Sequence, residues 1–255
     1  MKLKGAVIMI GSLYWEDDTN CINLSDQKTL ALSRKNWRNE KLVMEQSEII
    51  KLPIRYGRIS STRYCTYTMA FSNSVSNLGQ GYCVPYKNEI DITENFNQLF
   101  CQALELATVE GICKPEENKL YKKWGCVGLK LNQKLQKENP KVAEKLTEYW
   151  SSYFIHLDQE LYRINETEEP AVTSNGLLNF EISPVLNDID YFLATPVSQN
   201  IKEYPDGKII AESMLKTREE YFEYFVKNYI NNIRTKDDIN IIKFLPKQIK
   251  NLLIQ

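Results

Sequence analysis

A glycine–serine pair directly after an apolar run is the first feature of this sequence that could support chemistry. The apolar residues 6–10 are followed by Gly11, Ser12, Leu13 and Tyr14. A strand that ends at such a pair leaves backbone N–H groups unpaired and directed to one side, which suits a carboxylate or a phosphate. The same pair is also compatible with an ordinary turn. We therefore treat this loop as a candidate anion-binding element.

Glu110 is a candidate site residue because of its position on a predicted helix. Over residues 91–111, apolar side chains recur at steps of three and four, which predicts an amphipathic helix. We expect Thr93 to cap its N-terminus and Gly111 to end it. At about 100° per residue, Glu110 falls in the apolar sector, whereas Glu105 falls on the solvent side. Burial against Phe and Leu side chains would raise the pKa of such a carboxyl group toward neutrality, where it can both take and return a proton.

Arginine and tyrosine side chains are interleaved along residues 53–64. In a regular strand, Arg55 lies on one face and Tyr56 and Arg58 lie on the other, so the two arginines cannot both face one cavity. An inward-facing arginine can grip a substrate carboxylate or phosphate, while an outward-facing one flanks a hairpin at the surface. The tyrosines would also suit stacking on a nucleobase.

The composition is that of an ordinary globular protein. The chain has 255 residues, of which 43% are hydrophobic and 25% are charged, and its formal net charge is −1. This length can bury a sizeable core, and the balanced charge argues against a general attraction to nucleic acid or to a membrane surface. No apolar run reaches the length of a membrane span, and the N-terminus lacks an export signal, so we expect a cytoplasmic protein.

The histidine and cysteine content argues against several kinds of catalytic site. The single histidine, His156, is expected to pack near a helix end, and it cannot supply a zinc site with two imidazoles. No G-x-S-x-G turn supplies an activated serine. The cysteines are far apart and are expected to be reduced and structural. They are Cys21, Cys65, Cys83, Cys101, Cys113 and Cys126. The sequence therefore indicates neither a metal site nor another cofactor.

The remaining patterns predict an α+β chain. Strands are expected at residues 5–13, 44–59, 64–72, 81–86, 124–131 and 191–197. Helices are expected at residues 25–38, 91–111, 140–155 and 210–233. On the third of these helices Glu148 lies off the apolar stripe, as expected for a solvated charge. The tail at residues 236–255 combines isoleucines with lysines, which is compatible with a docking helix or with a partner surface.

Three short motifs, taken in their order along the chain, resemble the γ-glutamylcyclotransferase superfamily, including its ChaC-like branch. They are Gly-Ser-Leu-Tyr-Trp at residues 11–15, Gly-Tyr-Cys-Val-Pro at residues 81–85 and Trp-Gly-Cys-Val-Gly-Leu at residues 124–129. The resemblance covers about residues 6–132. It departs from the family at Ile10, where members carry a tyrosine, and in the order of Glu110 and the strand at residue 124.

The resemblance implies a mixed, barrel-like β-sheet core over residues 1–160, with flanking helices and a cavity, and a helical C-terminal extension over residues 161–255. It implies that a glutamate in the cavity closes 5-oxoproline from a γ-glutamyl amine or peptide. Glu110 is the nearest match for this glutamate, and Glu148 is the alternative because it follows the strand at residue 124, as the family's glutamate does. The expected substrate-binding residues are Gly11, Ser12, Leu13, Tyr14, Arg55, Tyr56 and Arg58.

Two further interpretations stay open. The same fold could bind a small anionic ligand such as a nucleotide without catalysis, through the interleaved arginines and tyrosines. The chain could also be an interaction subunit that forms a homodimer or binds another protein through its C-terminal helix. For both the cyclotransferase and the anion-binding protein, the expected partner is a small anionic molecule. Neither nucleic acid nor a membrane is expected as a partner.

Overall fold

The computed structural model describes residues 1–17, 25–182, 188–217 and 221–254. Its centre is a five-stranded mixed sheet with strand order β10-β11-β2-β6-β3. These strands are β10 (Gly128–Leu131), β11 (Tyr191–Ala194), β2 (Gly5–Met9), β6 (Gly79–Pro85) and β3 (Glu48–Leu52). β11 runs parallel to β2, and the other neighbouring pairs are antiparallel. The α+β class is thus confirmed, with β10 and β3 as the end strands of the sheet.

Strand β2 is the middle strand of this sheet. All five of its residues are buried, because β11 and β6 pair with its two edges and other elements cover its faces. Burial on both faces of the strand therefore explains the continuous apolar run at residues 6–10. The strand ends at Met9, earlier than the expected residue 13, because the chain turns at Gly11 into a short helix.

A hairpin of β4 (Ile54–Ser60) and β5 (Thr66–Phe71) extends from the sheet. The strand expected over residues 44–59 is divided at Pro53, which has no N–H group for a ladder hydrogen bond. The 3₁₀ turn η2 (Ser61–Arg63) forms the tip of the hairpin, and Tyr64 and Cys65 follow it with positive φ angles of 53° and 59°. Two small sheets, β1 (Lys2–Leu3) with β7 (Ile90–Asp91) and β8 (Tyr121–Lys122) with β9 (Gly125–Cys126), lie outside the central one.

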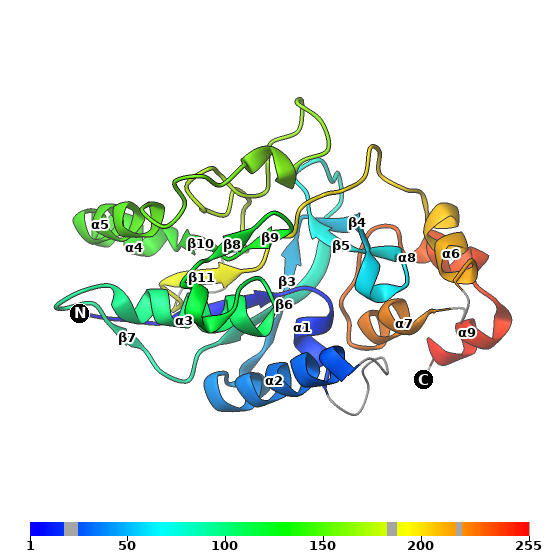
Figure 1. The fold of residues 1–255 in the computed structure, drawn as a ribbon, viewed down its shortest axis with the longest axis horizontal. Coiled ribbons are helices and arrows are strands. Elements are labelled where there is room, and N and C mark those ends of the chain that lie inside the picture. Colours follow the sequence, from blue (N-terminus) through cyan, green and yellow to red (C-terminus); the bar gives the residue numbers. More distant parts are fainter. Residues whose placement is uncertain (18–24, 183–187, 218–220, 255) are drawn as a thin grey trace.

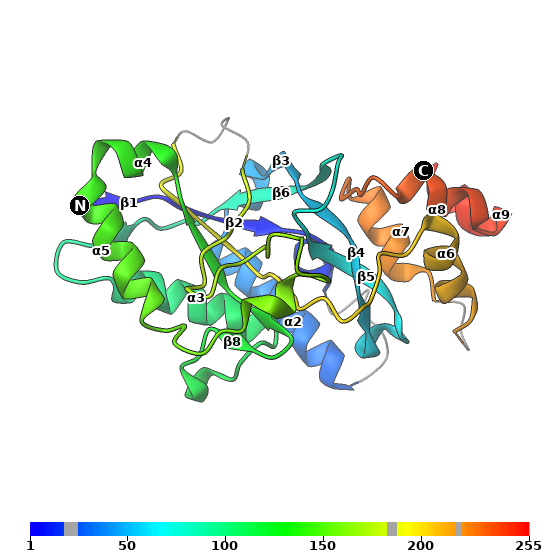
Figure 2. The ribbon, with the colours of Figure 1, turned by 90° about the horizontal axis from the view of Figure 1, so that it is seen from above.

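The helices gather in groups around the sheet. They are α1 (Ser12–Trp15), α2 (Ser25–Lys41), α3 (Asn97–Val109), α4 (Gln133–Glu138), α5 (Pro140–Ser151), α6 (Gly207–Leu215), α7 (Glu223–Ile230), α8 (Asp238–Phe244) and α9 (Lys247–Leu252). In Figures 1 and 2, α4 and α5 lie at one end of the molecule, and α6 to α9 lie at the other. The helices α2 and α3 contact each other beside the sheet.

The start of α3 corrects one prediction, and its end confirms another. Phe96, not Thr93, occupies the N-cap position, because Thr93 is bonded instead to Asp91 and to the N-terminal ammonium group. At the other end, Gly111 follows the helix with a φ of +73°, a conformation that favours glycine. This glycine fixes where the chain leaves α3 and therefore where Glu110 lies.

The C-terminal part of the chain differs from the prediction in three places. The helix expected over residues 210–233 is two helices, α6 and α7, and residues 218–220 between them lie outside the described residues. His156 is exposed, not packed, because α5 ends at Ser151 and the chain turns out to solvent beyond Phe154. Residues after 160 supply β11, which lies inside the central sheet, so the expected boundary at 160 and 161 does not separate the sheet from the rest of the chain.

Three further predictions concern the cysteines, membrane-spanning helices and the C-terminal tail. Cys65, Cys83, Cys101, Cys113 and Cys126 are free thiols, and Cys21 lies outside the described residues. No helix in the described ranges combines the length and the apolar character that crossing a membrane requires. On the C-terminal helices, Ile239 is 72% exposed and Phe244 is 47% exposed. Docking of a partner on this surface stays a prediction.

Candidate functional site

A pocket of about 450 Å³ lies at one end of the central sheet. Three of its lining residues follow strands of this sheet: Ile10 and Ser12 follow β2, and Thr195 follows β11. Because β2 and β11 are parallel, their carboxyl ends lie at the same end of the sheet, and residues that follow both strands therefore reach the same pocket. The other lining residues come from α1 and the residue after it, α2, the β4–β5 hairpin, the end of α3, α7, the turn between β8 and β9, and the segment after β11. They are Leu13, Glu16, Leu30, Arg34, Arg58, Ser60, Ser61, Thr62, Arg63, Thr68, Glu110, Gly111, Ile112, Trp124, Val197 and Tyr224.

The glycine–serine pair forms the turn that leads from β2 into α1. Gly11 has φ +82° and ψ −147°, a backbone conformation that residues with a side chain rarely adopt. A Cβ atom added to Gly11 would lie 2.5 Å from the hydroxyl oxygen of Tyr224. Ser12 and Leu13 line the pocket, and the first N–H groups of a helix have no acceptor within it. Tyr14 is not among the lining residues, because its ring stacks on Tyr82 with centroids 3.9 Å apart.

Glu110 lies at the C-terminal end of α3 and lines the pocket. Its side chain is 15% exposed, whereas that of Glu105 is 39% exposed and pairs with Lys41, so the predicted orientation of the two glutamates is confirmed. The surroundings of Glu110 are polar, however. Its Oε2 accepts a hydrogen bond of 2.7 Å from Arg34, and its Oε1 accepts one of 3.3 Å from the hydroxyl of Thr195.

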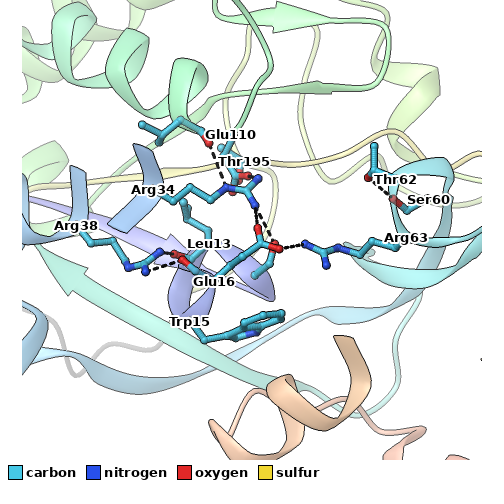
Figure 3. A network of polar contacts seen from close by, with 12 residues as sticks. Leu13, Trp15, Glu16, Arg34, Arg38, Ser60, Thr62, Arg63, Glu110 and Thr195 are labelled. Carbon is cyan, nitrogen blue, oxygen red and sulfur yellow. Dashed lines mark hydrogen bonds and ion pairs between the residues drawn. The ribbon is translucent and has the colours of Figure 1, made fainter. Parts of the chain in front are cut away.

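Glu16 is the second carboxylate of the pocket, and the two arginines that flank it occupy both of its oxygens. Arg34 donates to Oε2, and Arg63 donates to Oε1 at 2.7 Å (Figure 3). Burial acts to raise the pKa of Glu16, but the charges and hydrogen bonds of Arg63 and Arg34 outweigh it and hold the pKa below its usual value. Glu16 is therefore a carboxylate at neutral pH with no oxygen left for a substrate.

Arg38 fastens the segment that carries these groups. It lies one turn after Arg34 on α2 and donates hydrogen bonds of 2.7 Å to the carbonyl oxygens of Leu13 and Glu16. These two carbonyl groups belong to α1 and to the residue that follows it. Carbonyl groups at the end of a helix have no N–H partner within the helix. Arg34 and Arg38 thus fix α1 against α2, and with it the wall of the pocket.

The arginines of β4 correct the prediction from strand alternation. The β4–β5 register shifts between Tyr56 and Arg58, so that Arg55 pairs with Ala70 and Arg58 pairs with Thr68. Residues 68 and 70 share a face, and the bulge therefore places both arginines on the same face, not on opposite faces.

Of these two arginines, only Arg58 reaches the pocket, where it donates to the carbonyl and hydroxyl oxygens of Ser198. Arg55 instead stacks on the ring of Tyr204, 3.4 Å from its centroid. Tyr56 is 1% exposed, and neither it nor Arg55 is among the lining residues. Of the expected substrate-binding residues, the structure brings together Ser12, Leu13 and Arg58 at the pocket, and Gly11, which precedes Ser12, is not among the lining residues.

Glu148 lies away from this pocket. It is exposed on α5, at the end of the molecule opposite α6 to α9. The sequence analysis missed Glu16, Arg34 and Thr195. Arginines four residues apart at 34 and 38 place two cations on one helix face, which is a signal that the sequence does contain. Thr195 carries no such signal, because only the pairing of β11 with β2 brings it to Glu110.

Comparisons of this chain with protein-family models, with curated proteins and with solved structures find no match. Its function is therefore inferred from the pocket.

Proposed function

We propose that this pocket converts a γ-glutamyl amine or peptide to 5-oxoproline and a free amine, with Glu110 as general acid and base. In this reaction the α-amine of the substrate attacks its own γ-carbonyl carbon, and the bond from that carbon to the leaving nitrogen breaks. The attacking ammonium group must lose two protons to become the lactam N–H, and the departing nitrogen must gain at least one to leave as an amine. A single carboxylate beside both nitrogens can pass one proton from the first to the second, and the remaining proton goes to the released amine or to water, so the reaction needs no metal or other cofactor.

The observation that carries the proposal is the position of Glu110 in the pocket formed by the turn after β2. Among the described residues, its Oε1 contacts only the hydroxyl of Thr195, at 3.3 Å. That contact is long for a hydrogen bond between oxygens, so this oxygen can accept a proton from a substrate. Glu16, in contrast, has both oxygens bonded to arginines. Glu110 is thus the carboxylate of this pocket that is suited to proton transfer.

Substrate carboxylates have two places to bind. The first-turn N–H groups at Ser12 and Leu13 can donate to the α-carboxylate of a γ-glutamyl group. Arg58 provides a cation, since among the described residues it has no carboxylate within ion-pair distance and bonds only Ser198. Hydroxyl groups from Ser12, Thr68 and Thr195 line the same space and can donate to the carbonyl oxygen that gains charge.

The proposal is tested by measuring 5-oxoproline release from a panel of γ-glutamyl amino acids, peptides and amines. We expect Glu110→Gln, which keeps the shape of the side chain, to lower kcat by about 100-fold or more. Glu148→Gln is the matched control, because Glu148 is exposed and away from the pocket, and its kcat should stay within about twofold of wild type. Normal release by Glu110→Gln would refute the role of Glu110, and a large loss in Glu148→Gln would assign the role to Glu148.

The charge of the pocket favours one alternative, a binding protein for a small anion without catalysis. Three arginines line the pocket against two glutamates, which leaves it an excess of positive charge. Titration calorimetry with nucleotides and with inorganic phosphate, on wild type and Arg58→Gln, distinguishes the two functions. Tight binding that Arg58→Gln abolishes and Glu110→Gln leaves intact, without 5-oxoproline release from any substrate, would favour the binding protein.

A further inference from the structure

We propose that Glu16 is a positioning residue for Glu110 and acts through the guanidinium group of Arg34. This inference rests on the proposed function, because it concerns how the pocket keeps one oxygen of Glu110 free for proton transfer. The two carboxylates share one arginine, which lies between them in Figure 3.

The guanidinium group of Arg34 is fixed from three directions. Its Nε donates to the carbonyl oxygen of Val109 at 3.1 Å, and its Nη1 donates to Glu16 and, at 3.3 Å, to the hydroxyl of Ser12. Its Nη2 donates to Oε2 of Glu110 at 2.7 Å. A planar group held at all three nitrogens cannot rotate about its axis, so its plane and its distance from Glu110 are set by these partners.

The hydrogen bond between Arg34 and Glu16 decides how Arg34 binds Glu110. Guanidinium groups often bind carboxylates through two parallel hydrogen bonds, which would occupy both oxygens of Glu110. Because Nη1 is directed to Glu16, Arg34 meets Glu110 through one nitrogen and at one oxygen. Oε1 of Glu110 is therefore left to the pocket. Without the charge of Glu16, Arg34 can turn its second nitrogen to Glu110 and cover the oxygen that accepts the proton.

Glu16 is in turn held by Arg63 from the tip of the β4–β5 hairpin. Arg63 donates to Oε1 of Glu16 at 2.7 Å and to the hydroxyl of Tyr221 at 3.0 Å, and its guanidinium lies 5.0 Å from the ring centre of Tyr224. Charges of opposite sign therefore alternate from Arg63 through Glu16 and Arg34 to Glu110. The hairpin tip and the residues just before and within α7 thus bear on the orientation of Glu110, which lies on α3.

Glu16→Gln tests this arrangement, because it removes the charge and keeps the size of the side chain. With a γ-glutamyl substrate we expect kcat to fall by about 10- to 100-fold while KM stays within about twofold, the effect of misplacing a reacting group. A merely structural role of Glu16 would lower the amount of folded protein and leave kcat per folded molecule unchanged.

A second measurement needs no substrate and separates this inference from the proposed function. The denaturation midpoint is compared for wild type, Glu16→Gln, Glu110→Gln and the double variant. We expect Glu110→Gln to lower the midpoint more in the Glu16→Gln background than in wild type, because the pair of Arg34 with Glu110 is then stronger. Equal losses in both backgrounds would overturn the inference. A larger loss without any 5-oxoproline release would support the inference and refute the proposed function.

Glu16→Asp serves as the second variant if Glu16→Gln does not fold. It keeps the charge but withdraws the carboxylate by one methylene group, so that it cannot hold Arg34 and Arg63 at the same distances. We expect kcat to fall and KM to stay within about twofold, in the same direction as for Glu16→Gln. A folded Glu16→Asp protein with unchanged kcat would overturn the inference.

Discussion

Substitution of Gly11 by alanine tests the turn on which the whole pocket depends. With φ +82° and ψ −147°, Gly11 is in a region of backbone conformation that is almost restricted to glycine, and strain there costs about 1–3 kcal/mol. An alanine Cβ would also lie 2.5 Å from the hydroxyl oxygen of Tyr224, which α7 holds in place. Overlap in a packed core costs a further amount of about 1–3 kcal/mol. We expect Gly11→Ala to lower the free energy of unfolding by about 2–6 kcal/mol.

The two contributions are separated with Tyr224→Phe. Removing the hydroxyl leaves the ring carbons of residue 224 at 3.3 and 3.4 Å from the Cβ position, so most of the overlap is relieved while the backbone strain remains. Gly11→Ala should therefore cost about 1–3 kcal/mol less in the Tyr224→Phe background than in wild type. Tyr224→Phe alone also loses the hydrogen bond from the backbone N–H of Met69, but that loss is common to both members of the comparison and cancels.

Urea denaturation followed by tryptophan fluorescence is the assay, and Gly111→Ala is the control. Gly111 also has a positive φ, of +73°, but the nearest atom to a Cβ there is 3.7 Å away on Leu30, so only backbone strain of about 1–2 kcal/mol is expected. Equal costs of Gly11→Ala in both backgrounds would refute the contact with Tyr224. A cost below about 1 kcal/mol in wild type would refute the backbone conformation assigned to Gly11.

Three further predictions concern burial, charge and hydrogen bonding. Burial raises the pKa of Asp238 to about 7, well above its usual value of about 4, so the stability that this group contributes is full below about pH 4 and is lost as the pH rises to about 7. Asp238→Asn should therefore gain stability relative to wild type at pH 8 and not at pH 4, as measured by thermal denaturation across that range. Trp15→Phe should cost about 1–3 kcal/mol more than Trp37→Phe in urea denaturation, because the indole N–H of Trp15 bonds the buried Asn228 at 2.7 Å, whereas that of Trp37 has no hydrogen-bond partner among the described residues. Arg58→Gln should weaken binding of the anionic substrate or ligand by about 10-fold or more, seen as a raised KM or Kd; unchanged binding would exclude Arg58 from recognition.

The orientation of Glu110 is the part of the site that periodicity could predict. Along α3, Leu99, Ala103 and Leu106 are fully buried, and one further step of the same stripe leads to Glu110. The pattern depends only on the local geometry of a helix, and it is therefore readable without knowledge of the rest of the fold. The identity of the neighbours was not readable in this way. Glu110 meets Arg34 and Thr195, not the apolar side chains that the sequence analysis expected.

Other parts of the site depend on features that break local rules. The bulge near Gly57 changes which face of β4 carries Arg58, and one extra residue in a strand leaves no mark in an alternating pattern. Tyr14 and Tyr56 have residue types suited to binding, yet Tyr14 stacks on Tyr82 and Tyr56 is buried in the core. Residue type alone does not distinguish a ligand contact from a core contact, because an aromatic ring serves both.

The insertion of β11 between β10 and β2 has a consequence for how this protein emerges from the ribosome. Strand β2 is at residues 5–9, but the neighbour that completes one of its edges is at residues 191–194. Until β11 has been made, β2 and β10 cannot be joined, and each of them keeps open the strand edge that pairs with β11. Pairing across such a distance in sequence is slow, and open edges can pair with other chains. We expect β2, β6 and β3 to be able to pair earlier, and the five-stranded sheet to be completed only after β11 has been made.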